Sequence, residues 1–177
     1  MGVSYVGIDP GLVHTGMVAL NIDDTARKLS VRYRAFDTLY DAAGALDASL
    51  SVRTVREHLV KEPPLFPIGG IFVEAYRSRG NNLRTDAKMR ALLSEFRLHM
   101  PSAEVIDNTG SKQVVRPPLL KVLNMDTFPA THHQDLQAAA RILVFGMLKQ
   151  DTANRYLYDI VDAHLDLNPW LRRKAAW

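Results

Sequence analysis

The N-terminal part of the chain alternates between apolar runs and short polar turns. Residues 3–9 are β-branched and apolar and end on an acid, Asp9, which predicts a buried strand. A turn signal at 10–11 separates it from a second apolar run at 15–22. Residues 29–36 alternate apolar and polar side chains with a period of two, which predicts a third strand. The short turns between these runs predict an antiparallel meander.

Helical and strand patterns alternate in the rest of the chain. Prolines 63–64 end the first helix, and the next apolar run ends on a second acid, Glu74. Thr131 is the residue that we expect to cap the third helix. In order, the expected elements are a helix at 45–62, a strand at 71–73, a polar loop at 76–82, a helix at 83–100, a strand at 103–106, a short helix near 119–124 and helices at 131–150 and 153–165.

Three antiparallel strands followed by alternating strands and helices is the order of the ribonuclease-H fold. The sequence therefore predicts an α/β protein with a mixed five-stranded sheet and helices on both faces. A doubly wound parallel sheet would need helices between the first strands, where the chain leaves no room. The 177 residues suit a single domain, 1–177, that closes with a short helix and a basic, aromatic tail at about 152–177.

Composition indicates the class of protein and its cellular setting, but says little about its activity. Hydrophobic residues make up 47% of the chain and charged residues 23%, as in ordinary globular proteins. No apolar run is long enough to span a membrane, and the N-terminus lacks the basic segment of a signal peptide. With no cysteine, a reducing, cytoplasmic setting is the expectation. Charge is uneven, since residues 77–121 carry a net +5, which suits a polyphosphate partner or an ordinary solvated helix.

Three acids stand at positions that a sheet would bring together. Asp9 and Glu74 each end a short apolar strand, and neighbouring central strands would place them at one edge of the sheet. Asp135 lies near the start of the helix at 131–150, and His132 three residues earlier shares its expected helical face. Such a cluster can hold Mg²⁺, and two such ions can promote hydrolysis of a phosphodiester. His132 could be a further ligand or could orient the attacking water.

Each residue also has a structural explanation. Asp9 before a Pro-Gly pair can start a turn, and Glu74 can pair with Arg77 or Arg79. Asp135 in the first turn of a helix interacts favourably with the helix dipole. The conjunction of all these residues in this topology favours the metal-site interpretation.

Four segments resemble motifs of RuvC-type Holliday-junction resolvases. GIDPGLVHTG at 7–16 is similar to the first motif, and FVEAY at 72–76 to the second. HHQDLQAAA at 132–140 resembles the last motif, and the stretch from 108, NTGSKQVVRPPLLKVL, a divergent form of the segment before it. The resemblance spans most of residues 3–145 and indicates a divergent member from a phage or mobile element, acting in the host cytoplasm if phage-encoded.

The resemblance implies a set of roles. Asp9, Glu74, His132 and Asp135 would hold two Mg²⁺ ions per active site, with Mn²⁺ as a substitute, and Lys112 and Lys121 would offset charge at the scissile phosphate. The family acts as a homodimer that makes symmetric paired nicks in four-way junctions, and forks or flaps are further candidate substrates. The residues expected to contact DNA are Tyr76, Arg77, Arg79, Arg84, Lys112, Arg116 and Lys121.

Two departures from the family pattern matter. The aromatic wedge of the family follows the second-motif Glu by three residues, whereas Tyr76 follows Glu74 by two. Prolines 117 and 118 interrupt the helix expected around the two lysines. Alternatives therefore stay open: a related nuclease acting on RNA or an RNA–DNA hybrid, such as those that trim ribosomal RNA precursors, or a catalytically weak junction-binding protein. An actin-like ATPase would need a second domain and a second phosphate loop.

Overall fold

One mixed sheet organises the molecule. The structure is a computed structural model that describes residues 2–26, 28–78 and 82–165. Its five strands lie in the order β3-β2-β1-β4-β5, with β1 antiparallel to β2, β2 antiparallel to β3, and parallel pairing of β1 with β4 and of β4 with β5. This confirms the predicted fold class. The strands are β1 (Gly2–Asp9), β2 (His14–Asp23), β3 (Lys28–Asp37), β4 (Ile68–Glu74) and β5 (Ala103–Ile106).

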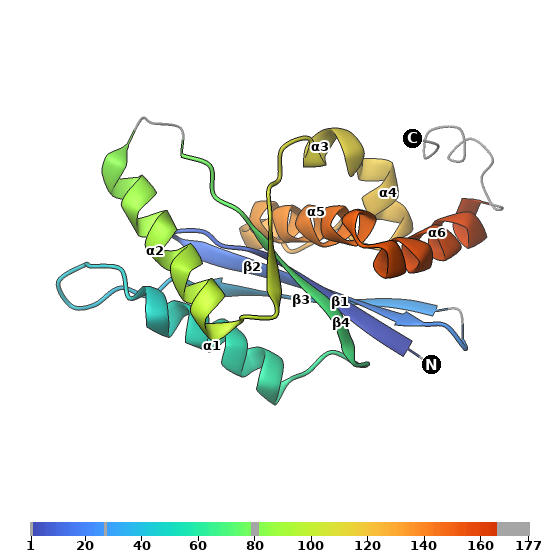
Figure 1. Ribbon diagram of the computed structural model, residues 1–177, viewed down its shortest axis with the longest axis horizontal. Helices are drawn as coiled ribbons and strands as arrows, with labels where there is room; N and C mark the ends of the chain where they lie inside the picture. The colour runs from blue at the N-terminus through green and yellow to red at the C-terminus, as the bar shows by residue number, and fades with distance from the viewer. Residues whose placement is uncertain (1, 27, 79–81, 166–177) are drawn as a thin grey trace.

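Helices cover both faces of the sheet (Figure 1). On one face lie α1 (Ala48–Lys61) and α2 (Leu83–His99). On the other lies α5 (His133–Lys149), flanked by α3 (Ser111–Val114), α4 (Pro117–Val122) and α6 (Asp151–Leu165), and preceded by a 3₁₀ turn, η1 (Ala130–His132). In the described ranges, no helix combines the length and apolar character needed to cross a membrane.

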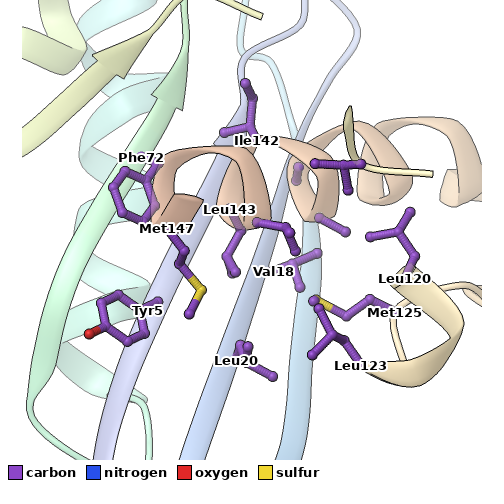
Figure 2. Close-up of a cluster of buried hydrophobic side chains, with 14 of the residues drawn as sticks. Tyr5, Val18, Leu20, Phe72, Leu120, Leu123, Met125, Ile142, Leu143 and Met147 are labelled. Carbon is purple, nitrogen blue, oxygen red and sulfur yellow. The ribbon is translucent and has the colours of Figure 1, made fainter. Parts of the chain in front are cut away.

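Each strand sends alternate side chains to the two faces, which produces two separate cores. On β1, Tyr5 belongs to the core under α5, whereas Val6 and Ile8 belong to the core under α1 and α2. Figure 2 shows the core under α5: Leu143 and Met147 lie over Val18 and Tyr5 of the sheet. Leu120, Leu123 and Met125 close the side of this core.

The α5 face is unusually close to the strands because glycines replace side chains there. A Cβ on Gly7 of β1 would overlap the carbonyl oxygen of Ala139, and one on Gly16 of β2 would overlap the carbonyl oxygen of Asp135. Both contacts are with helix backbone, which cannot move aside as a flexible side chain would. The glycines therefore set the height of α5 above β1 and β2.

Several predicted boundaries need correction. The expected cap at Thr131 is wrong: α5 starts at His133 with His132 as N-cap residue, and no side chain caps it. Prolines 117 and 118 do not interrupt a helix, but occupy the first two positions of α4, where no backbone N–H is needed. The strand expected at 71–73 extends over Ile68–Glu74, and the four-residue α3 has no counterpart in the prediction, since so short a segment shows no periodicity.

Candidate active site

Asp9 and Glu74 meet at the carboxyl edge of the sheet. The parallel pairing of β1 with β4 aligns Ile8 with Val73, so the next residues on the two strands are the two acids. By strand alternation both acids face α5, on the same side as Tyr5 and Phe72. Their side chains are hydrogen-bonded to each other. Starting a turn therefore does not account for the contact that Asp9 makes with Glu74.

The environment disfavours negative charge on this pair. Burial, then the charge of Glu74 and a hydrogen bond to it, then the charge of Asp135, raise the pKa of Asp9 to about 9. Burial also raises the pKa of Glu74, although hydrogen bonds from Asp9 and Asn108 and the charges of Lys112 and Arg141 oppose the increase. Two partly buried carboxyl groups in contact share a proton unless a cation balances their charge.

Asp135 reaches the pair because α5 lies so low over β2. Gly16 is the register partner of Asp9 on β2, and the backbone of Asp135 sits directly above Gly16. Asp135 belongs to the first turn of α5, where the helix dipole also stabilises its charge. The structure thus brings the three predicted acids to one place, from β1, β4 and α5.

Three further residues contact or influence the acids. Asn108, two residues beyond β5, donates a hydrogen bond from its side-chain amide to Glu74 Oε1. Lys112 in α3 and Arg141 in α5 both lower the pKa of Glu74, so both lie within electrostatic range. Lys112 was predicted here, whereas Asn108 and Arg141 were not assigned a role at the site.

His132 lies just before the helix rather than on its face, since it is the N-cap residue of α5. Its ring packs edge to face against His14, with 4.7 Å between centroids and an interplanar angle of 82°. Its Nδ1 is buried without a hydrogen-bond partner among the described residues. His14 was not predicted to take part in the site.

A cleft of about 720 Å³ opens at Asp9 and Glu74. The rest of its lining comes from the residue after Asp9, the start of the β4–α2 loop, α2 and the β5–α3 loop: Pro10, Ala75, Tyr76, Arg77, Ser78, Met89 and Asn108. Tyr76 and Ser78 both donate hydrogen bonds to Asp86, a buried residue of α2. The loop after Glu74 is therefore fastened to α2 on one side of the cleft.

The predicted ion pair between Glu74 and Arg77 is not formed in the structure. Arg77 pairs with Asp107 instead, so the interpretation of Glu74 as the structural partner of Arg77 is wrong. Arg79 lies outside the described residues. Hydrogen bonds from Thr109 and then from Arg77 lower the pKa of Asp107 to about 2, which keeps it ionised at neutral pH.

The other predicted DNA contacts are dispersed. Arg84 is exposed in the first turn of α2, and Arg116 is exposed before α4 with its Nε–H on the carbonyl of Gln113. Lys121 is exposed in the last turn of α4, and among the described cations it is not one of those that shift the pKa of Glu74 or Asp9. The structure therefore brings Lys112, but not Lys121, to the acids.

The donors at this edge suit a hard divalent cation in kind. Two carboxyl groups in contact, with a third acid close enough to raise the pKa of Asp9, offer the oxygen ligands that Mg²⁺ prefers. Over the part of the chain that the structure describes, no group of three or more His, Cys, Asp or Glu side chains is arranged to hold an ion as it stands. Asp9 and Glu74 are accordingly the two central residues of the candidate metal site.

Only part of this constellation has a signal in the sequence. The strand-end acids follow apolar runs, and Lys112 and Asp135 lie in motif-like segments. Asn108 has one indirect signal, since it follows the β5 strand end next to the Glu74 strand. His14 lies inside the motif-like segment 7–16, but nothing in that segment points to its partners. Arg141 has no signal, because a single polar residue reveals no long-range partner in one sequence.

Comparison with known proteins gives a fold-level likeness. No protein-family model matches the sequence, and no curated protein matches it. The structure of T. thermophilus RuvC in complex with a Holliday junction substrate has 18% identity and a TM-score of 0.56, over 81% of this chain and 91% of that chain. Thermus thermophilus RuvC alone has 21% identity and a TM-score of 0.50, over 81% and 92%. This chain therefore has a RuvC-like, ribonuclease-H-like fold.

Proposed function

We propose that this chain is a structure-selective endonuclease that cuts branched DNA, with four-way junctions as its main substrate. We further propose that residues 1–177 form one nuclease domain and that the protein acts as a homodimer, with two sites making paired, symmetric nicks. A phage or mobile-element origin, and action in the cytoplasm, are part of the same proposal. Forks and flaps are secondary substrates.

One observation carries this proposal: the contact between Asp9 and Glu74, with Asp135 held above Gly16, at the carboxyl edge of a RuvC-like fold. Burying two carboxyl groups against each other costs free energy and contributes nothing to a structural core. For a protein that only binds DNA, uncompensated acids facing phosphates would be repulsive. A cation-dependent reaction at a phosphate gives the acids a use.

The residues divide the work of phosphodiester hydrolysis. Asp9 and Glu74 would hold divalent cations, two per site, with Asp135 and His132 completing the ligand set. Mg²⁺, with Mn²⁺ as a substitute, would activate the attacking water and stabilise charge on the leaving oxygen. Lys112 would offset charge at the scissile phosphate, and Asn108 would hold the Glu74 carboxylate in one orientation.

DNA contacts in this proposal extend outward from the cleft. Arg77 at the cleft wall would bind a phosphate next to the scissile one, and Arg79 and Arg84 would continue the path. Tyr76 would act at the junction centre, with its hydroxyl anchored on Asp86. Arg116 and Lys121 would contact more distant phosphates rather than the reacting one.

The test compares wild type with Asp9→Asn, which removes one charge with little change in shape. Each protein is incubated with a labelled four-way DNA junction, a matching linear duplex and an RNA–DNA hybrid, in Mg²⁺ and in EDTA. Asp24→Asn is the matched control, because Asp24 is an exposed acid in the turn at the opposite end of β2. We expect Mg²⁺-dependent paired nicks on the junction from wild type and control, and none from Asp9→Asn.

The alternatives give distinct results in the same experiment. Cleavage of the hybrid but not the junction would keep the metal site and assign an RNA-containing substrate. Salt-dependent junction binding by a wild type that cuts nothing in Mg²⁺ or Mn²⁺ would contradict the nuclease proposal and favour a junction-binding protein.

A further inference from the structure

His14 occupies a position determined by the alternation of β2. On this strand Val18, Leu20 and Ile22 belong to the core under α5, and Gly16 lies against the backbone of α5. Two residues before Gly16, His14 is the next position on this same face. It therefore lies at the start of α5, where the chain enters the helix through His132.

A carboxylate on the neighbouring strand β3 fixes the His14 ring. His14 and Asp37 are direct register partners across β2 and β3, so their side chains lie on the same face. The Nδ1 of His14 is 3.0 Å from Asp37 Oδ1. Because a carboxylate can only accept, Nδ1 carries the proton in this hydrogen bond. The bond restricts the ring orientation of His14.

The ring of His132 is held in a different way. A histidine that serves a metal site usually donates its second N–H to a carboxylate or carbonyl, which fixes the ring. In His132, Nδ1 is buried and has no such partner among the described residues. The imidazole of His14 contacts this ring nearly at right angles, with 4.7 Å between the two ring centroids. The Asp37 carboxylate thus contacts His14 and not His132 itself, and His14 in turn contacts the His132 ring.

We propose that His14 is a positioning residue for His132: Asp37 orients His14, and the His14 ring in turn holds the His132 ring against the start of α5. The inference rests on the proposed function, in which His132 serves the nuclease site. Packing rather than hydrogen bonding fixes the ring, since Nδ1 of His132 has no hydrogen-bond partner among the described residues. His14 itself contacts neither the acids nor the substrate in this scheme.

The experiment compares His14→Leu, which keeps bulk but removes the ring, with His14→Phe, which keeps an aromatic ring but cannot bind Asp37. Junction cleavage in Mg²⁺ should fall about 10- to 100-fold in His14→Leu, as for other residues that orient a ligand from behind. His14→Phe should retain a rate within about threefold of wild type, since the edge-to-face contact persists. Junction affinity in EDTA should be unchanged in both.

A second measurement does not depend on activity. The ¹H–¹⁵N signals of the imidazole nitrogens of His132 are recorded at one pH in metal-free protein and assigned with His132→Ala. We expect one sharp set of signals in wild type and His14→Phe, and shifted or broadened signals in His14→Leu. His133→Ala is the matched control, because His133 packs against Phe128 instead and its loss should leave the His132 signals unchanged.

The outcomes separate the two proposals. A wild type without metal-dependent cleavage would defeat the proposed function, while the His132 signals would still report whether His14 positions that ring. Wild-type His132 signals and a wild-type cleavage rate in His14→Leu would overturn the positioning role. Equal losses in His14→Leu and His14→Phe would also overturn it, since they would show that an aromatic ring at position 14 does not hold His132.

Discussion

The two faces of the sheet are packed by different means. Under α1 and α2, large side chains such as Val55, Leu92 and Phe96 fill the space between helix and strand. Under α5, glycines at positions 7 and 16 let the helix backbone rest directly on β1 and β2. A layer of side chains can readjust when one member changes, but a backbone-to-backbone contact cannot.

This difference bears on the candidate site. Asp135 and His132 stand at the start of the helix that touches the strands, so their height above Asp9 depends on single missing methyl groups. None of the described residues that line the cleft belongs to α1. Both faces contribute a buried apolar core, but the α5 face also sets the position of the candidate site.

Gly16→Ala should have the largest effect on cleavage. Its methyl group overlaps the carbonyl of Asp135, so the start of α5 must rise from Asp9. We expect a loss of about 100-fold in the single-turnover rate of junction cleavage, the size expected for a misplacement of about 1 Å. Overpacking should also lower the free energy of unfolding by about 1–3 kcal/mol, measured by urea titration.

The control for that substitution is Gly70→Ala in β4. The nearest atom to its added methyl is a ring carbon of Phe72 at 3.1 Å, a contact that small shifts relieve. We expect a cleavage rate within about twofold of wild type. Equal losses in Gly16→Ala and Gly70→Ala would mean that glycine content, and not the height of α5, explains the effect.

Asn108→Ala should have the next largest effect. It removes the hydrogen bond that the amide donates to Glu74, a loss of about 1–1.5 kcal/mol in orientation of the carboxylate. We expect about a tenfold lower cleavage rate at saturating Mg²⁺, with stability nearly unchanged. Asn108→Asp, which replaces the donor by a further acid, should lose more. A wild-type rate in both variants would remove Asn108 from the site.

Arg77→Ala should affect binding more than the reaction. Loss of one phosphate contact should weaken junction affinity several-fold and reduce the slope of log affinity against log salt by about 1. Adding Arg79→Ala should extend both effects. Asp107→Asn is the opposite variant: it releases Arg77 from its ion pair and should tighten binding. An unchanged affinity at several salt concentrations would exclude Arg77 from the DNA path.

Val55→Ala on the other face should leave the cleavage rate unchanged. Val55 is fully packed between α1 and the sheet, and losing two methyl groups should cost about 2 kcal/mol of unfolding free energy. Measured on folded protein, the rate should stay within about twofold of wild type. A large drop would contradict the dependence of the site geometry on the α5 face rather than on the α1 face.

The sequence predicted the frame of this arrangement well. Strands that end on acids were visible because apolar runs mark buried strands, and their alternation decides which face each acid takes. The element order then predicted the sheet, which the strand pairing confirmed. The approach of α5 was not predictable, since a glycine such as Gly16 looks like a turn signal until its partner across the layer is known.

The start of α5 shows the limit most clearly. Thr131 is a favourable cap by residue type, yet η1 precedes the helix and His132 takes the cap position. A cap contributes only about 1 kcal/mol, so packing of the first turn against β2 decides where the helix begins. The proposed role of His14 could not be predicted for the same reason, since it depends on how the start of α5 packs against β2.

The wide separation along the chain of Asp9, Glu74 and Asp135 has a consequence for synthesis. Chains emerge from the ribosome N-terminus first and fold as their partners become available. A nascent chain carries the first two acids long before α5 follows, and the paired acids stay without Asp135 until α5 docks on the sheet. The proposed nuclease activity is therefore withheld until α5 has been translated and has docked on the sheet.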